Sequence, residues 1–164
     1  MARREEASPN DAGLDARRAA FALVTAALQR RSGIDEALAT PGFAALDGRD
    51  RSFARALAMT VLRRRGALDL ALHSRLQKPP PDAVLTLLRL GAAQLWHMEV
   101  PAHAAIATTV ELAAQERTTR PFKGLVNAVL RGLQREPPPA APPEALAPDW
   151  LFAQIGRASC RERV

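Results

Sequence analysis

Residues 120–135, RPFKGLVNAVLRGLQR, carry polar side chains at a spacing suited to binding an extended polyanion. Lys123, Asn127 and Arg131 recur every four residues, so on a helix they would form one strip. Cations in such a strip can bind phosphate oxygens of a nucleic acid, although an exposed lysine or arginine is more often simply solvated. Two interpretations of Asn127 stay open, contact with the nucleic acid and a structural hydrogen bond.

A second pair of cations, Arg17 and Arg18, lies early in the first expected helix. A guanidinium group presents its N–H donors in a planar fork that matches two oxygens of a phosphate. The pair could therefore clamp a phosphate, and the alternative is a solvated start of a helix. Arg63, Arg64 and Arg65 form a further group at the end of another helix, where positive charge also stabilises the helix dipole.

Motifs of catalysis and cofactor binding are absent from the sequence. It holds no glycine-rich phosphate loop, no H-E-x-x-H and no G-x-S-x-G. His73, His97 and His103 fall on separate helices or helix starts, so they do not predict a metal site. Cys160 is the only cysteine, which excludes a disulfide within the chain and a cysteine metal site. We therefore predict no catalytic, metal-binding or cofactor-binding residue in this chain.

The composition predicts an all-α fold. Hydrophobic residues make up 48% of the chain, largely alanine and leucine, whereas aromatic residues, which strands favour, make up only 4%. Apolar residues recur at helical spacing, and no segment alternates as a strand would. Asp15 is the expected cap of the first helix, and Pro41-Gly42 is an expected break. We expect a bundle of about seven helices, at residues 15–31, 34–39, 50–65, 68–76, 82–98, 101–116 and 122–135.

The apolar residues of three helices predict which side of each faces the core. The last helix should bury Phe122, Leu125, Val126, Val129, Leu130 and Leu133. The helix at 50–65 should direct inward Phe53, Ala56, Leu57, Thr60 and Val61. The helix at 82–98 should be the most buried, through a band of Val84, Leu87, Leu88, Gly91, Leu95 and Met98.

Several other residues are expected at helix edges or surfaces. Arg89 and Gln94 should lie at the edges of the 82–98 helix, and Asp69 on a helix surface. A strip of small side chains on the last helix would let another backbone approach closely, at Gly124, Ala128 and Gly132.

The chain divides by composition into five segments. Residues 1–13 are charged and should be disordered, and residues 14–135 should form the helical domain. Residues 136–148 hold six prolines and predict an extended linker. Residues 149–154 read as the start of a second domain. The last segment, residues 155–164 (IGRASCRERV), resembles a translated sequencing adapter, and we expect it to be an assembly artefact.

The overall charge suggests an acidic partner. The formal net charge is +6, and it would fall by two without residues 155–164, which hold three arginines and one glutamate. A modest positive charge is consistent with binding nucleic acid. The sequence has neither a long apolar run nor the apolar segment of a signal peptide, so we expect a cytoplasmic protein without a membrane partner.

Five fragments in order resemble the NusB-like domain at the N-terminus of the RsmB family of small-subunit ribosomal RNA methyltransferases. They are ARRAAFALV at 16–24, DRSFARALAMTVLRR at 50–64, LLRLGAAQLWHMEVPAHAAI at 87–106, VELA at 110–113 and KGLVNAVLR at 123–131. Arg131 stands where free-standing NusB commonly has an acidic residue, and with HAAI and the linker this favours the methyltransferase family.

The resemblance implies a NusB-like bundle that binds RNA, with small-subunit rRNA as the partner. Arg17 and Arg18 match the family's N-terminal arginines, and Lys123, Asn127 and Arg131 match its signature helix. The full-length parent would transfer a methyl group from S-adenosylmethionine to carbon 5 of a cytosine. Its Rossmann-like C-terminal domain, with paired cysteines, would be a second partner.

This chain departs from the family by stopping just after PDWLF, so no cofactor or catalytic residue can be assigned to it, and alone it should be inactive. Two alternatives stay open. One is a stand-alone NusB-type antitermination module with a NusE-like protein partner. The other is a helical adaptor that binds no RNA and packs through the strip of Gly124, Ala128 and Gly132.

Overall fold

The computed structural model describes residues 9–29 and 33–138, together with 140 and 142. The described residues contain α-helices and one 3₁₀ turn but no strand, which confirms the all-α prediction. The helices are α1 (Pro9–Leu28), α2 (Gly33–Leu38), α3 (Pro41–Ala44), α4 (Gly48–Arg63), α5 (Arg65–His73), α6 (Asp82–His97), α7 (Ala102–Gln115) and α8 (Lys123–Leu133), with the 3₁₀ turn η1 (Arg120–Phe122) before α8.

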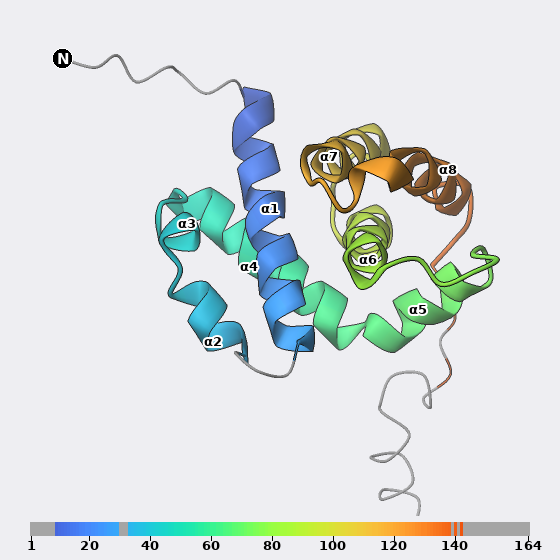
Figure 1. Ribbon diagram of the computed structural model, residues 1–164, viewed down its shortest axis with the longest axis horizontal. Helices are drawn as coiled ribbons and strands as arrows, with labels where there is room; N and C mark the ends of the chain where they lie inside the picture. The colour runs from blue at the N-terminus through green and yellow to red at the C-terminus, as the bar shows by residue number, and fades with distance from the viewer. Residues whose placement is uncertain (1–8, 30–32, 139, 141, 143–164) are drawn as a thin grey trace, which may run out of the picture.

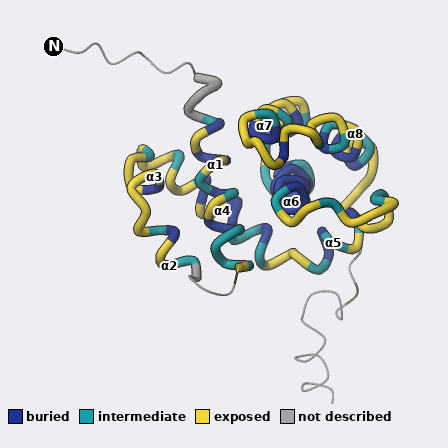
Figure 2. Tube along the Cα trace, viewed as in Figure 1, coloured by how far each residue is buried: buried dark blue, intermediate teal, exposed yellow. Residues whose placement is uncertain are grey.

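Helix α6 is the centre of the bundle. It packs against α1, α4, α5, α7 and α8, and in Figure 1 it is seen nearly end-on among them. Helix α1 crosses α4 on one side, while α7 and α8 lie together on the other. All residues from 84 to 94 are buried, as the dark blue of α6 in Figure 2 shows. The prediction that this helix is the most buried is therefore confirmed.

The prediction from the sequence was wrong for two polar residues of α6. Arg89 and Gln94 were expected at the helix edges, but they are 5% and 0% exposed. Arg89 donates two hydrogen bonds to the carboxylate of Asp69 on α5, at 2.6 and 2.9 Å. Asp69 is consequently not a free surface residue either, because a buried guanidinium requires a partner.

The helix boundaries differ from the predicted ones at several places, among them the helix predicted at 68–76, which is α5 at Arg65–His73. Helix α1 begins at Pro9, so residues 9–13 are not part of a disordered segment and Asp15 lies inside the helix; residues 1–8 lie outside the described residues. Pro41-Gly42 starts the short α3, because proline suits the first turn of a helix. Helix α4 begins at Gly48, since the side chain of Asp47 accepts a hydrogen bond from the backbone N–H of Asp50 at 2.7 Å.

Helix α8 is held by its apolar side against α6 and α7. Its fully buried side chains include Leu130 and Leu133, and Phe122 and Leu125 are half-buried at the edge of the same core. Gly91 of α6 faces Leu130, and a Cβ at Gly91 would lie only 2.6 Å from the Leu130 methyl groups. An alanine at this position would force the buried Leu130 side chain to shift, so glycine suits the close approach of α6 and α8.

The end of the helical domain is tied back to the bundle at Glu136. The indole N–H of Trp96 donates to the backbone carbonyl of Glu136 at 3.1 Å, and Arg75 forms an ion pair with the Glu136 side chain. The structure describes only part of the predicted linker at 136–148. The predicted start of a second domain at 149–154 and the suspected artefact at 155–164 lie outside the described residues.

Candidate nucleic-acid interface

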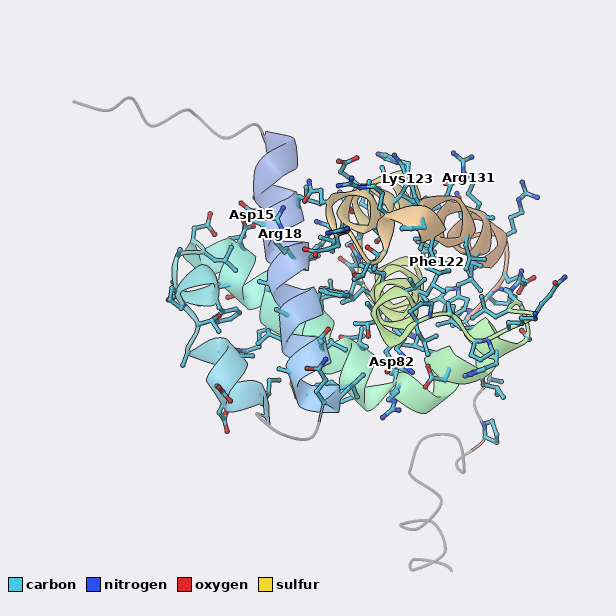
Figure 3. All side chains as sticks on the ribbon, in the orientation of Figure 1. Asp15, Arg18, Asp82, Phe122, Lys123 and Arg131 are labelled. Atoms are coloured by element: carbon cyan, nitrogen blue, oxygen red, sulfur yellow. The ribbon has the colours of Figure 1, made fainter. Side chains whose placement is uncertain are left out.

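The outer side of α8 carries the strip predicted from the sequence, here called the α8 strip (Lys123, Asn127 and Arg131). Lys123 and Arg131 are exposed, and Figure 3 shows both projecting from the same side of the helix. Within the described residues neither cation forms an ion pair. Two uncompensated charges therefore project from a helix that the core holds in place.

Asn127 contacts its neighbour in the strip. The side chain is half-buried, and its Oδ1 accepts a hydrogen bond from the Nε–H of Arg131 at 3.1 Å. The contact holds the Arg131 side chain along the helix surface, and the N–H donors on both terminal nitrogens of that guanidinium remain available. The structure thus adds a third interpretation to the two left open by the sequence, because Asn127 is placed to orient Arg131.

Three further cations flank the α8 strip in the sequence, and the sequence analysis did not name them. Arg117, Arg120 and Arg135 are exposed at the two ends of the segment that contains α8. Arg120 also donates from Nε to the carbonyl of Ala114 at 2.9 Å, which satisfies the end of α7. A signal for this surface was present in the sequence, because residues 117–135 contain no aspartate or glutamate.

The fold places the two N-terminal arginines in different environments. Arg18 has a 45% exposed side chain, pairs with Asp15 on its own helix, and donates to the side chain of Gln115 at the end of α7. This contact places Arg18 beside the turn that leads from α7 to Arg117. Arg18 thus lies at the near end of the cationic segment, although its positive charge is paired with the Asp15 carboxylate.

Arg17 is instead a buried residue of the core, with 8% exposure. Its Nε–H donates to Gln94 at 2.6 Å, its Nη1 donates to the carbonyl of Gly13 at 2.7 Å, and its guanidinium carbon lies 4.9 Å from the ring centre of Phe53. Burial lowers the pKa of Arg17 from its ordinary value, and the nearby Asp50 carboxylate partly offsets that effect. These contacts join α1 to α6 and weigh against a phosphate clamp at Arg17.

The described residues were compared with the features of metal and dinucleotide sites. Among them no three histidine, cysteine, aspartate or glutamate side chains gather as metal ligands do. They also contain no strand from which a glycine-rich cofactor loop could start. Burial, with a smaller contribution from Arg64, lowers the pKa of His97 and so favours its neutral imidazole. No described helix is long and apolar enough to cross a membrane.

Comparison with known protein families identifies the family of this chain. The sequence profile of the NusB family matches residues 14–135, which is most of the chain and includes all five candidate residues. The chain belongs to the NusB family. Its helical bundle, from α1 to α8, is the NusB domain, and the α8 strip lies near the end of that domain.

The relatives of this NusB domain are considerably longer proteins. A ribosomal RNA small subunit methyltransferase B of Xanthomonas campestris is 43% identical over 150 residues, which cover 88% of this chain and 33% of the relative. The proteins of the same name in Pseudomonas putida and Xylella fastidiosa are 45% and 40% identical, over 56% and 66% of this chain and 21% and 26% of theirs. The chain thus spans about a third of the length of the first of these relatives. Because the first similarity covers 88% of the chain, it continues beyond Arg135 into the proline-rich segment.

Proposed function

We propose that this NusB domain binds RNA, and that it does so as the RNA-holding domain of a small-subunit rRNA cytosine-C5 methyltransferase. The observation that carries the proposal is the α8 strip, which presents Lys123 and Arg131 without ion-pair partners in the described residues, within a segment that lacks carboxylates. Relatives named as rRNA methyltransferases supply the class of nucleic acid. The proposed partner is therefore small-subunit rRNA, and the proposed location is the cytoplasm.

The methyl transfer itself would belong to another domain of the full-length protein. That domain would bind S-adenosylmethionine and carry the catalytic cysteines, and the segment at 136–148 would connect it to the NusB domain. The anchoring of Glu136 by Trp96 and Arg75 supports such an arrangement, because it fixes where the proline-rich segment leaves the bundle. On this proposal the NusB domain contributes affinity and no chemical step.

The residues proposed to contact RNA are Arg18, Lys123, Asn127 and Arg131. Lys123 would meet a phosphate as a point charge, whereas Arg131 can bind two phosphate oxygens at once. Asn127 would act mainly by holding Arg131, and it can offer its own amide N–H groups. Arg17 is left out, because its donors serve Gln94 and Gly13 within the bundle. Phosphate contacts of this kind give affinity more than sequence preference.

The test is the salt dependence of RNA binding by a variant that loses both strip cations. Wild-type chain and Lys123→Gln/Arg131→Gln would be titrated into a labelled single-stranded RNA of small-subunit sequence, about 25 nucleotides long, at several salt concentrations. Each phosphate contact on a single strand contributes about 0.7 to the slope of log affinity against log salt, so the variant should lose about 1.4. The control is Lys78→Gln/Arg49→Gln, which removes two exposed cations that have no ion pair in the described residues and do not belong to the α8 strip.

The outcome that would contradict the proposal is an equal slope for the strip variant and the control variant. Asn127→Ala adds a second, independent reading. If Asn127 orients Arg131, the substitution weakens RNA binding while the melting temperature stays unchanged. Weaker binding that accompanies a lower melting temperature would instead assign Asn127 a structural role.

A further inference from the structure

A second cationic surface lies on α4, away from α8. Six residues line a groove with a volume of about 360 Å³. We call it the α4 groove, and its residues are Arg51, Ser52, Arg55, Ala56, Met59 and Arg63. None of them is acidic, so the groove brings together three guanidinium groups without a carboxylate among its walls.

Neutral groups hold two of these arginines in place. Arg51 donates from Nη2 to the carbonyls of Ala44 and Leu46, at 2.9 and 2.8 Å, where α3 ends. The guanidinium of Arg55 lies 6.0 Å from the ring centre of Phe43, which is a buried residue of α3. These contacts set the direction of both side chains but leave their positive charges uncompensated.

Several arginines elsewhere in the described part of the chain form ion pairs. Arg18, Arg65, Arg75 and Arg89 each pair with a carboxylate. No ion pair of the described residues includes an arginine of the α4 groove. The segment around α8 and the α4 groove thus each hold several cations that have no carboxylate partner in the described residues.

We propose that the α4 groove binds a second stretch of the RNA backbone. The proposal rests on the RNA-binding function argued above and adds a contact surface to it. Arg51, Arg55 and Arg63 lie on one helix, and the rise of an α-helix spreads them over about 18 Å. A row of this length fits a linear polyanion better than a single phosphate or a carboxylate.

The position of the groove sets a requirement on the RNA. Helix α6 packs against both α4 and α8, and it separates them in Figure 1. An RNA in contact with both surfaces therefore passes around the bundle. The two surfaces would then contribute separate sets of phosphate contacts, whose effects on the salt slope add because they lie on different helices.

The experiment compares variants of the two surfaces on the same long single-stranded RNA. Arg55→Gln/Arg63→Gln is expected to lower the salt slope by about 1.4, and combining it with Lys123→Gln/Arg131→Gln should lower it by about 2.8. Arg51 is kept, since it also binds the carbonyls at the end of α3. Lys78→Gln/Arg49→Gln is the control with equal loss of charge, because neither residue lines the α4 groove or forms an ion pair in the described residues. Circular dichroism checks that each variant retains the wild-type fold.

The outcomes separate this inference from the proposed function. A reduced slope for the α8 variant with a control-like slope for the α4 variant would overturn the inference and leave the proposed function standing. A reduced slope for the α4 variant alone would support the groove and count against the α8 strip. Arg63→Glu gives a second reading, because Arg63 has no hydrogen-bond or ion-pair partner in the described residues. Reversing its charge should weaken RNA binding more than Arg63→Gln does, and equal affinity of the two variants would contradict the inference.

Discussion

The contact between Gly91 and Leu130 makes a prediction about how α8 is held in position. A methyl group added at Gly91 would lie 2.6 Å from both Leu130 methyl carbons and 3.2 Å from Leu130 Cγ. Leu130 is fully buried, so its side chain has little room to move away. Alanine in place of a helical glycine gains about 0.5–1 kcal/mol, whereas overpacking a core costs about 1–3 kcal/mol. We therefore expect Gly91→Ala to destabilise the fold by about 1–2 kcal/mol.

A double substitution tests whether the cost comes from this contact. Leu130→Ala alone should cost about 2–5 kcal/mol, because it leaves a cavity in the core. In Gly91→Ala/Leu130→Ala the new methyl group enters part of that cavity. The double variant should therefore be about 1–2 kcal/mol more stable than the sum of the single changes predicts.

Gly124 provides the matched control, as a glycine of α8 with nothing within 4 Å of its Cβ position. Gly124→Ala should be neutral or stabilise the fold by about 0.5 kcal/mol, since only helix propensity changes. Urea denaturation followed by circular dichroism measures all four variants. If Gly91→Ala were as harmless as Gly124→Ala, or if the double variant were additive, the account of how α6 holds α8 would be wrong.

Three further predictions concern buried polar groups. Gln94→Ala removes the partner of the buried Arg17 Nε–H and should cost about 2–4 kcal/mol, measured by urea denaturation; a cost below 1 kcal/mol would contradict the network. Asp69→Ala leaves the Arg89 guanidinium unpaired and should cost about 2–4 kcal/mol, whereas Asp69→Leu/Arg89→Met should recover most of it. Because burial lowers the pKa of His97 below its ordinary 6.5, the unfolded chain binds the proton first, and stability should fall as the pH drops below about 6.5. His97→Gln should reduce this loss of stability at low pH. If the pH dependence of the urea midpoint is the same in His97→Gln as in the wild type, His97 is not its source.

The apolar pattern of the sequence was sufficient to predict most of the bundle. The i, i+3, i+4, i+7 spacing identified α6 as the most buried helix and placed Val126, Val129, Leu130 and Leu133 on the inner side of α8. The pattern was less informative for α4, where Ala56 was expected inward and is exposed. Alanine fits either environment, and here Ala54 and Ala58 share the inner side with Leu57 instead.

The polar residues could not be placed by periodicity alone. Arg17 and Arg18 are neighbours in the sequence, yet one is buried against Gln94 and the other reaches Gln115. Arg89 is buried because Asp69 is within hydrogen-bond distance on another helix. Each of these environments depends on a partner far along the chain, which a pattern read along one helix does not reveal. Lys123, Asn127 and Arg131 were easier to predict, because they lie together on a single helix.

The most direct test of RNA binding is a nuclear magnetic resonance titration of the 17.7 kDa chain with single-stranded RNA of small-subunit sequence. We predict that the backbone amide signals of Lys123, Asn127 and Arg131 shift on addition of RNA, together with that of Arg18. Added salt should reverse these shifts. Amide shifts confined to surfaces remote from α8, or no shift at moderate salt, would contradict the account.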